Sequence, residues 1–160
     1  MEQEEAEKPN ARSLALRRLG VREYSAHEMR SYLKRKGVES EEAARVVEEL
    51  VGERMIDDHR YAGVVARAQS NRDQGPGKIM AKLRAKGVRA GLAEARALFN
   101  EHSSRDELSL ARSILERRYP NAREDLREQR RAYAALIRRG FSGDVARRAL
   151  GSADPGEGEE

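Results

Sequence analysis

The residues that could carry out chemistry are few and widely spaced in this sequence. Cysteine is absent, which excludes disulfides, thiolate metal ligands and a cysteine nucleophile. The three histidines, His27, His59 and His102, do not stand at the spacing of a metal site, so we interpret them as surface or capping residues. Asp57 and Asp58 are adjacent at a predicted helix start. A capping role explains them better than a carboxylate pair that converges on one substrate atom.

A short segment, Gln74-Gly75-Pro76-Gly77-Lys78, bears a faint likeness to a phosphate-binding loop. The full motif requires Gly-x4-Gly-Lys-Ser/Thr after a strand, whereas here Ile79 follows Lys78 and no strand is predicted before the segment. We therefore predict a loop that leads into a helix, with the helix N-terminus open to a phosphate or carboxylate. The chain has no threonine, and no acid, base, nucleophile or metal set converges. We predict that the protein is not an enzyme and binds no cofactor.

The elements that must position these residues are helices, and they repeat. Three segments end alike, at Leu33–Val38, Leu83–Val88 and Leu136–Phe141, with offsets of 50 and 53 residues. Each has Leu, a polar or apolar residue, a basic residue or Ala, a basic residue, Gly and an apolar residue, in that order. Basic side chains favour the negative end of a helix, and a glycine just beyond it adopts the left-handed conformation at little cost. We predict that the apolar residues on these helices serve packing: Met29, Leu33, Ile79, Leu83, Leu136 and Ile137.

Start signals define the other ends of the helices. We predict capping boxes at Ser25 with Glu28 and at Ser104 with Glu107, and a helix whose first turn holds Pro76. The remaining predicted N-caps are Ser40, either Asp57 or Asp58, and Ser142. The apolar spacing predicts no strand. It predicts nine helices, over residues 12–22, 25–36, 40–52, 58–70, 76–86, 90–100, 105–118, 124–139 and 143–150.

The composition favours thin helical layers over one thick core. Only two Phe, five Tyr and no Trp are available among 160 residues, and 38% of the residues are charged. We therefore predict an all-α protein of three tandem three-helix repeats that form an elongated, curved array. The repeats are predicted at residues 12–56, 57–101 and 102–151. Residues 1–11 and 152–160 are acidic and poor in apolar residues, and we predict disordered tails there.

The charge of the helical body is strongly positive. The net charge of the chain is +4, and the body without its acidic tails carries about +11. Residues 72–89 hold six bases and one acid, and residues 117–148 hold ten bases and four acids, whereas residues 39–60 are acidic. Arginine pairs can simply form a solvated helix face, but their concentration in one third of the chain favours a polyanionic partner.

The sequence also bears on the cellular compartment. No apolar run approaches the roughly 20 residues needed to cross a bilayer, and the acidic, polar start is unlike a secretory signal. The lack of cysteine fits a reducing compartment. We expect a soluble, cytoplasmic protein that does not bind a membrane.

Several motifs carry a resemblance to a known family. They are Arg22-Glu23-Tyr24-Ser25 with Met29 and Leu33, Lys36-Gly37-Val38, Met55-Ile56-Asp57-Asp58-His59-Arg60-Tyr61-Ala62, and Gly75-Pro76-Gly77-Lys78-Ile79 followed by Leu83 and Lys86-Gly87-Val88. At these separations the chain resembles the bacterial RecX family of RecA regulators, over about residues 12–150. The third repeat departs most, because Arg138-Arg139-Gly140-Phe141 replaces the Lys-Gly-Val ending. The acidic tails look peculiar to this chain.

The resemblance implies a function that composition does not give. RecX-like proteins consist of three three-helix units, bind in the groove of the RecA filament on single-stranded DNA, and restrain ATP hydrolysis, strand exchange and cleavage of the LexA repressor. We expect a monomer that binds this filament and makes at most weak, nonspecific contact with DNA. The arginine and lysine density assigns the contact to Lys78, Lys82, Arg84, Lys86, Arg89, Arg130, Arg131, Arg138 and Arg139. The alternative is a stand-alone DNA-binding protein with helix-turn-helix-like units.

Overall fold

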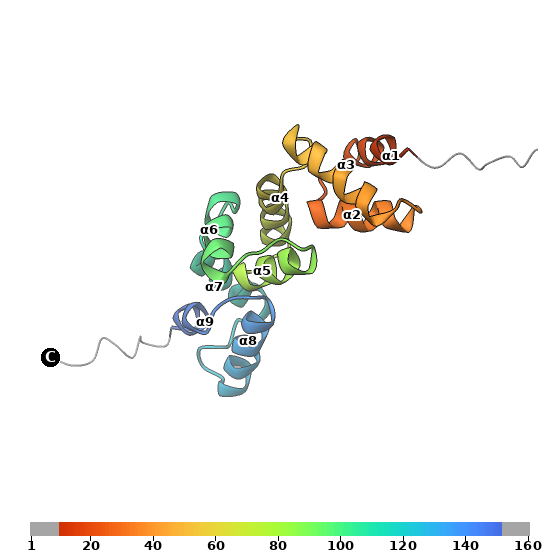
Figure 1. Cartoon of the computed structure of the whole chain (residues 1–160). Coiled ribbons are helices and arrows are strands. Elements are labelled where there is room, and N and C mark those ends of the chain that lie inside the picture. Colours follow the sequence, from red (N-terminus) through yellow and green to blue (C-terminus); the bar gives the residue numbers. More distant parts are fainter. Residues whose placement is uncertain (1–9, 152–160) are drawn as a thin grey trace, which may run out of the picture. The chain divides into compact units, whose positions relative to one another are not determined.

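The computed structural model describes residues 10–151, and within this range it contains nine α-helices and no strand (Figure 1). The all-helical prediction is confirmed, and each helix ends within three residues of its predicted bounds. Most of both predicted tails lies outside the described residues, although Ala11, placed in the first tail, begins a helix that Asn10 caps. The helices are α1 (Ala11–Leu19), α2 (Ala26–Arg35), α3 (Ser40–Gly52), α4 (Asp58–Asn71), α5 (Pro76–Ala85), α6 (Leu92–His102), α7 (Glu107–Arg118), α8 (Leu126–Arg138) and α9 (Gly143–Ala149).

The described residues divide into two compact units. Unit 1 comprises residues 10–62 together with residues 85–88, and unit 2 comprises residues 63–84 together with residues 89–151. Helix α4 therefore contributes its first turn to unit 1 and the rest of its length to unit 2, and the short segment after α5 belongs to unit 1. Each unit has its own buried side chains and is described separately.

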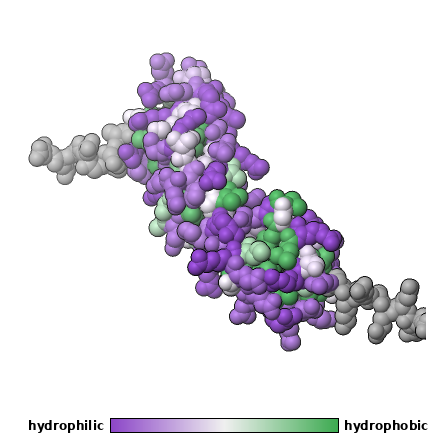
Figure 2. Space-filling model, turned by 90° about the horizontal axis from the view of Figure 1, so that it is seen from above, coloured by the Kyte–Doolittle hydropathy of each residue, from purple (hydrophilic) through white to green (hydrophobic). Residues whose placement is uncertain are grey.

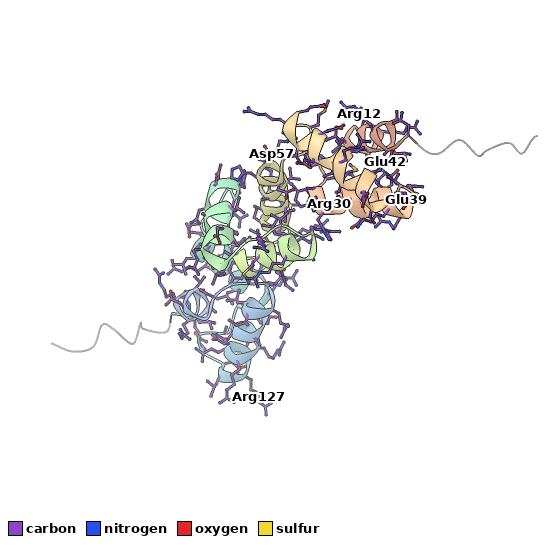
Figure 3. The ribbon with its side chains drawn as sticks, viewed as in Figure 1. Arg12, Arg30, Glu39, Glu42, Asp57 and Arg127 are labelled. Atoms are coloured by element: carbon purple, nitrogen blue, oxygen red, sulfur yellow. The ribbon has the colours of Figure 1, made fainter. Side chains whose placement is uncertain are left out.

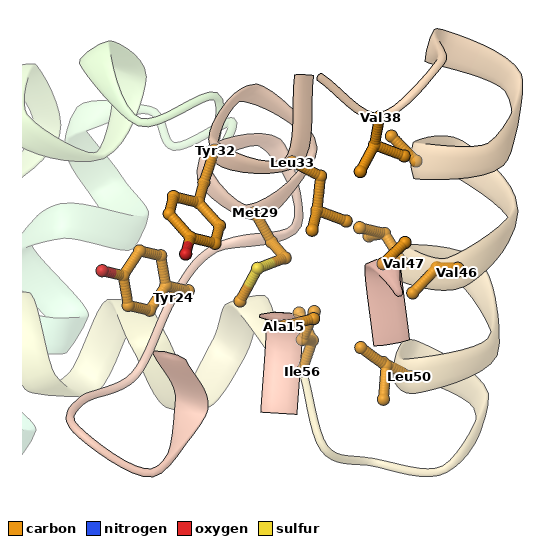
Figure 4. Packing of buried hydrophobic residues seen from close by; sticks show 12 residues of the cluster. Ala15, Tyr24, Met29, Tyr32, Leu33, Val38, Val46, Val47, Leu50 and Ile56 are labelled. Atoms are coloured by element: carbon orange, nitrogen blue, oxygen red, sulfur yellow. The ribbon is translucent and has the colours of Figure 1, made fainter. Parts of the chain in front are cut away.

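The core of unit 1 lies between α1, α2 and α3. The apolar positions of α2 and α3 recur at three and four residues, so each helix presents one apolar face. Met29 and Leu33 of α2 meet Val47 and Leu50 of α3, and Ile56 after α3 closes the cluster (Figure 4). These five side chains are almost completely buried, which explains how a chain so poor in aromatic residues builds a core.

The core of unit 2 is built in the same manner from α4 to α9. Ile79 and Leu83 of α5, Ile114 of α7 and Leu136 of α8 are fully buried. Five of the six predicted packing residues are therefore confirmed. The prediction for Ile137 is wrong, because 41% of this residue is exposed. It follows Leu136 directly, and adjacent residues on a helix point about 100° apart, so only one of the two faces the core.

The three predicted glycine helix ends are confirmed. Gly37, Gly87 and Gly140 have φ angles of +88°, +70° and +90°, in the left-handed region. At Gly37 and Gly140 the following residue closes the Schellman pattern, since the N–H of Val38 donates to the Leu33 carbonyl and that of Phe141 donates to the Leu136 carbonyl. Two residues that are not glycine, Arg54 and Asp73, adopt the same conformation after α3 and α4, with φ of +59° and +58°. Neither position was predicted from the sequence.

The predicted helix starts are confirmed in part. Ser25 and Ser142 cap α2 and α9 with their hydroxyl oxygens, and α5 begins at Pro76. The prediction of Ser104 is wrong, because the N-cap of α7 is Asp106, a stronger acceptor whose carboxylate takes the Ser109 N–H at 2.8 Å.

The other two N-cap predictions concern α3 and α4. Ser40 is the first residue of α3, and its N-cap is Glu39, which makes no side-chain capping bond, so that prediction is wrong. Asp57 accepts the Arg60 N–H at 3.1 Å before α4, as a cap does. Asp58 instead accepts the Ala26 N–H at 2.8 Å and so helps to start α2.

Candidate binding surface

The surface of the described residues is dominated by charged side chains. The face shown in Figure 2 is largely hydrophilic with smaller apolar areas, and Figure 3 shows charged side chains projecting from the helices of both units. Among residues 10–151, no group of three His, Asp or Glu residues is placed to hold a metal ion. None of the helices in this range combines the length and the apolar character that crossing a bilayer demands. Recognition of a partner by charge is the chemistry that this surface offers.

In unit 2, the start of α5 is joined to the end of α8. The Gly75 N–H donates to the Arg139 carbonyl at 2.7 Å, and the Gly77 N–H donates to the Gly140 carbonyl at 2.8 Å. The backbones approach so closely that a Cβ atom on Gly140 would lie 2.5 Å from the Lys78 nitrogen. Glycine is therefore required here for space as well as for its positive φ. We call this contact the glycine junction.

The glycine junction overturns one interpretation that the sequence left open. A phosphate-binding loop needs free N–H groups that point toward the ligand. The N–H groups of Gly75 and Gly77 are instead used by carbonyls of the α8 end. The Gln74-Gly75-Pro76-Gly77-Lys78 segment is a loop that leads into a helix, as predicted, but its N-terminus is not open to an anion.

The junction also brings together basic residues from two distant parts of the sequence. Lys78 stands in the first turn of α5, and Arg138 and Arg139 stand at the end of α8, next to Gly140. Lys78 and Arg138 are exposed. Arg139 is half-buried and donates from its guanidinium to the Asp73 carbonyl at 3.3 Å. Arg139 therefore holds the loop before α5 in addition to contributing charge.

The other predicted contact residues in unit 2 lie along the same two helices, except Arg89, which follows α5. Lys82 follows Lys78 by one helical turn, and Arg130 and Arg131 lie in the first half of α8. All are exposed and form no ion pair within residues 10–151. Arg89 is exposed as well. Arg84, on α5, is the one residue in this paragraph whose side chain makes a hydrogen bond within residues 10–151, since its Nε donates to the Ala90 carbonyl at 3.2 Å.

Lys86 differs from the other eight predicted contact residues because it belongs to unit 1. Its backbone carbonyl accepts the Ser25 hydroxyl at 2.7 Å, and its Nζ lies 3.7 Å from a carboxylate oxygen of Glu28. It is half-buried. The structure thus engages Lys86 with the start of α2.

A buried carboxylate in unit 1 was missed by the sequence analysis. Glu28 is only 9% exposed, and it accepts the Tyr61 hydroxyl at 2.6 Å and the Arg22 guanidinium at 2.9 Å. Burial raises the pKa of Tyr61 well above its usual range, and the Glu28 carboxylate raises it further. The sequence held one signal, because Glu28 stands at the third position of the predicted capping box, of which only the Ser25 half forms. Its carboxylate turns to Arg22, Tyr61 and Lys86, which only the tertiary fold brings near.

The histidines lie on separate elements. His27 is on α2, where its side chain packs against Gly87, and a Cβ at Gly87 would lie 2.4 Å from it. His102 ends α6 and lies over Gly63, with Arg67 Nη2 at 3.4 Å from its Nδ1. His59 is exposed in the first turn of α4. The side chains of His27 and His102 thus have local packing roles.

Comparison with protein-family models gives three matches in chain order. The first three-helix domain of RecX matches residues 11–50, the second matches residues 57–95 and the third matches residues 105–150. These models cover α1 to α3, α4 with α5 and the start of α6, and α7 to α9. The prediction of three three-helix repeats is confirmed, and its boundaries stay a prediction.

Similar proteins and structures agree with the family models. The chain is 36% identical over 144 residues to "Regulatory protein RecX" of Halorhodospira halophila, covering 89% of this chain and 88% of that protein. It is 36% identical over 138 residues to the protein of that name in Trichlorobacter lovleyi, covering 83% and 88%. The crystal structure of RecX from Lactobacillus salivarius has the same fold, with a TM-score of 0.75 at 19% identity, covering 88% of this chain and 92% of that one. A second crystal structure of regulatory protein RecX gives 0.72 at 26% identity over 89% and 70% of the two chains.

Proposed function

Because the chain belongs to the RecX family of regulatory proteins, we propose that it binds the RecA filament on single-stranded DNA and inhibits its activities. Those activities are ATP hydrolysis, strand exchange and cleavage of LexA. The observation that carries the proposal is the family match over all three three-helix domains. The protein acts in the cytoplasm by binding and does not catalyse a reaction.

The exposed bases of α5 and α8 support the choice of contact surface. Lys78, Lys82, Arg130, Arg131 and Arg138 are solvent-accessible and carry no ion pair within residues 10–151. Like charges placed close together cost stability unless a partner of opposite charge is present. Carboxylates on a protein filament or the phosphates of its DNA would supply that charge. We assign Arg84 and Arg139 a smaller share, since each also holds the fold, and Lys86 a structural role first.

The ATPase rate of the cognate RecA on single-stranded DNA tests the function. Titration with the full chain, well below one copy per RecA, is expected to lower the rate markedly, because a regulator that blocks filament growth acts at low ratios. No change up to equimolar protein, with the helical fold checked by circular dichroism, would contradict the proposal. The DNA-binding alternative would then be tested with duplex DNA. Sequence-specific binding with little salt dependence favours that alternative, and a steep salt slope indicates nonspecific phosphate contact.

Charge reversal tests the surface. Changing Lys78, Lys82, Arg130 and Arg131 to Glu is expected to weaken filament binding by at least about 100-fold, since each charged contact is worth on the order of 1 kcal/mol or more. The matched control reverses four other exposed bases, Arg17, Lys34, Arg112 and Arg147. Equal losses from the two variants would mean that only net charge matters. Unchanged binding of the first variant would refute the assignment while leaving the proposed function intact.

A further inference from the structure

Unit 1 contains a charged hollow that shares only Lys86 with the contact residues of the proposed function. It lies between α1, α2 and the segment after α5, and it has a volume of about 270 Å³. Four basic side chains line it, Arg18, Arg22, Arg35 and Lys86, against a single carboxylate, Glu28. We propose that this hollow is a binding site for a phosphate group.

The one carboxylate in the hollow does not neutralise the four bases. Glu28 is held by Arg22 at 2.9 Å, by Lys86 at 3.7 Å and by the Tyr61 hydroxyl at 2.6 Å, so its oxygens are already occupied. Arg18 and Arg35 have no acidic partner within residues 10–151. The hollow therefore carries an excess of positive charge that an anion would relieve.

Two of the guanidinium groups are held in place by aromatic rings. The guanidinium carbon of Arg22 lies 3.7 Å from the centre of the Tyr24 ring, and that of Arg18 lies 4.7 Å from the centre of the Tyr32 ring. Both tyrosines are buried, so the rings are fixed. Stacking occupies the face of a guanidinium and leaves the N–H groups at its edge free to donate. Nη1 of Arg22 already donates to Glu28 and to the Glu23 carbonyl, so Arg22 offers its remaining N–H groups, whereas the guanidinium of Arg18 makes no hydrogen bond within residues 10–151. Binding then costs less side-chain entropy than it would with free arginines.

The arrangement of the donors favours phosphate over a carboxylate. Arg18 comes from α1, Arg35 from α2, and Arg22 and Lys86 from two loops, so the donors approach from several directions. A planar carboxylate satisfies one guanidinium in a two-bond pairing, whereas a tetrahedral phosphate offers oxygens to several donors at once. The phosphate can come from a free nucleotide or from the backbone of single-stranded DNA, and the chemistry of the site is the same for both.

A titration of the full chain followed by NMR tests the site. The side-chain N–H signals of Arg18, Arg22 and Arg35 are monitored while sodium pyrophosphate is added at constant ionic strength. Saturable shifts are expected. The double variant Arg18→Gln, Arg35→Gln should raise the dissociation constant for pyrophosphate by at least about tenfold. The matched control, Arg17→Gln with Arg127→Gln, removes two exposed charges outside the hollow and should change it by less than about twofold. If the double variant loses its native spectrum, the single variant Arg35→Gln replaces it, because the Arg35 side chain makes no hydrogen bond within residues 10–151.

The outcomes separate the possible ligands. ADP that shifts the same signals at lower concentration than an oligothymidylate identifies a free nucleotide as the source, and the reverse order identifies the DNA backbone. Either result supports the site. Shifts that do not saturate, or equal losses in the double variant and its control, overturn it. It is also overturned if a glutamate-rich peptide binds the hollow and pyrophosphate does not. Because the test needs no RecA, its result is independent of the proposed function.

Discussion

Replacing Gly140 with alanine is expected to destabilise the protein far more than the same replacement at two other glycines of similar conformation. Gly37 and Gly151 have φ angles of +88° and +78°, and an added Cβ would meet nothing within 4 Å at either. Each of these substitutions should cost about 1 kcal/mol, the strain of a left-handed alanine. Gly140 has a φ of +90°, but its Cβ would lie 2.5 Å from the Lys78 nitrogen and 3.1 Å from the Gly75 oxygen.

The additional cost at Gly140 follows from the glycine junction. The nearest of the neighbouring atoms, the Lys78 nitrogen, belongs to the backbone, so relief of the clash must move α5 away from the α8 end. Forced overpacking costs about 1–3 kcal/mol, and the two hydrogen bonds donated by Gly75 and Gly77 would each lose up to about 1 kcal/mol. With the strain of about 1 kcal/mol, we therefore expect a total of about 2–6 kcal/mol for Gly140→Ala.

Urea unfolding followed by circular dichroism at 222 nm measures this difference. Gly151→Ala is the closest control, because Gly140 and Gly151 both belong to unit 2, and Gly37→Ala reports on unit 1. A Gly140→Ala variant whose free energy of unfolding falls no further than that of Gly151→Ala would refute the argument. The positive φ alone would then explain the glycine, and the close approach of α5 to α8 would have no energetic weight.

Three further predictions concern buried groups. Tyr61→Phe should cost about 1–3 kcal/mol near neutral pH, because Glu28 loses the hydroxyl that it accepts at 2.6 Å. Since the folded protein raises the pKa of Tyr61 above its unfolded value of about 10, the tyrosine's contribution is complete below that pH and is lost above it. Urea midpoints between about pH 8 and pH 11 should fall for the native chain and less for the variant, and parallel curves would contradict this. Burial raises the pKa of Glu107, one of whose oxygens has no hydrogen-bond partner, so Glu107→Gln should stabilise by up to about 1 kcal/mol at pH 7. This gain should disappear as the pH falls from the raised pKa of Glu107 in the folded protein to the ordinary pKa of a glutamate, and a destabilised variant at pH 7 would count against it. Leu136→Ala should cost about 2–5 kcal/mol and Ile137→Ala less than about 1 kcal/mol, because the first residue is buried and the second is not. If thermal unfolding showed similar losses of stability for the two variants, the assignment of Leu136 to the core and of Ile137 to the surface would be contradicted.

The helices were predictable because their signals are local. The Leu33 to Val38 ending and its counterpart at Leu136 to Phe141 contain everything a Schellman stop requires within six residues. The start of α7 was predicted wrongly because two local signals compete there. Ser104 and Asp106 are both good caps, and the choice between them depends on which acceptor is stronger and on where α6 ends, at His102.

The candidate surface was predictable only in its composition. Runs of arginine and lysine indicate a basic body, but a charge count does not distinguish an exposed base from one that holds the fold. Arg139 reaches a carbonyl 66 positions away, and Lys86 reaches Glu28. The hollow in unit 1 was hidden for another reason. Its four bases are spread from Arg18 to Lys86, so no short stretch of the sequence contains all of them.

The position of Lys86 has a consequence for how such proteins can be cut or duplicated. The segment of residues 85–88 lies within the second family domain by sequence, yet it completes unit 1, where its backbone accepts the Ser25 hydroxyl. A fragment that ends at residue 62 would lack Lys86, so the buried Ser25 would lose the carbonyl to which it donates and Glu28 would lose the nearby ammonium group. The stretch of sequence that repeats is thus offset from the stretch that packs as one body. Shuffling of single domains should fail here, whereas exchanges that retain the following glycine turn should yield folded proteins.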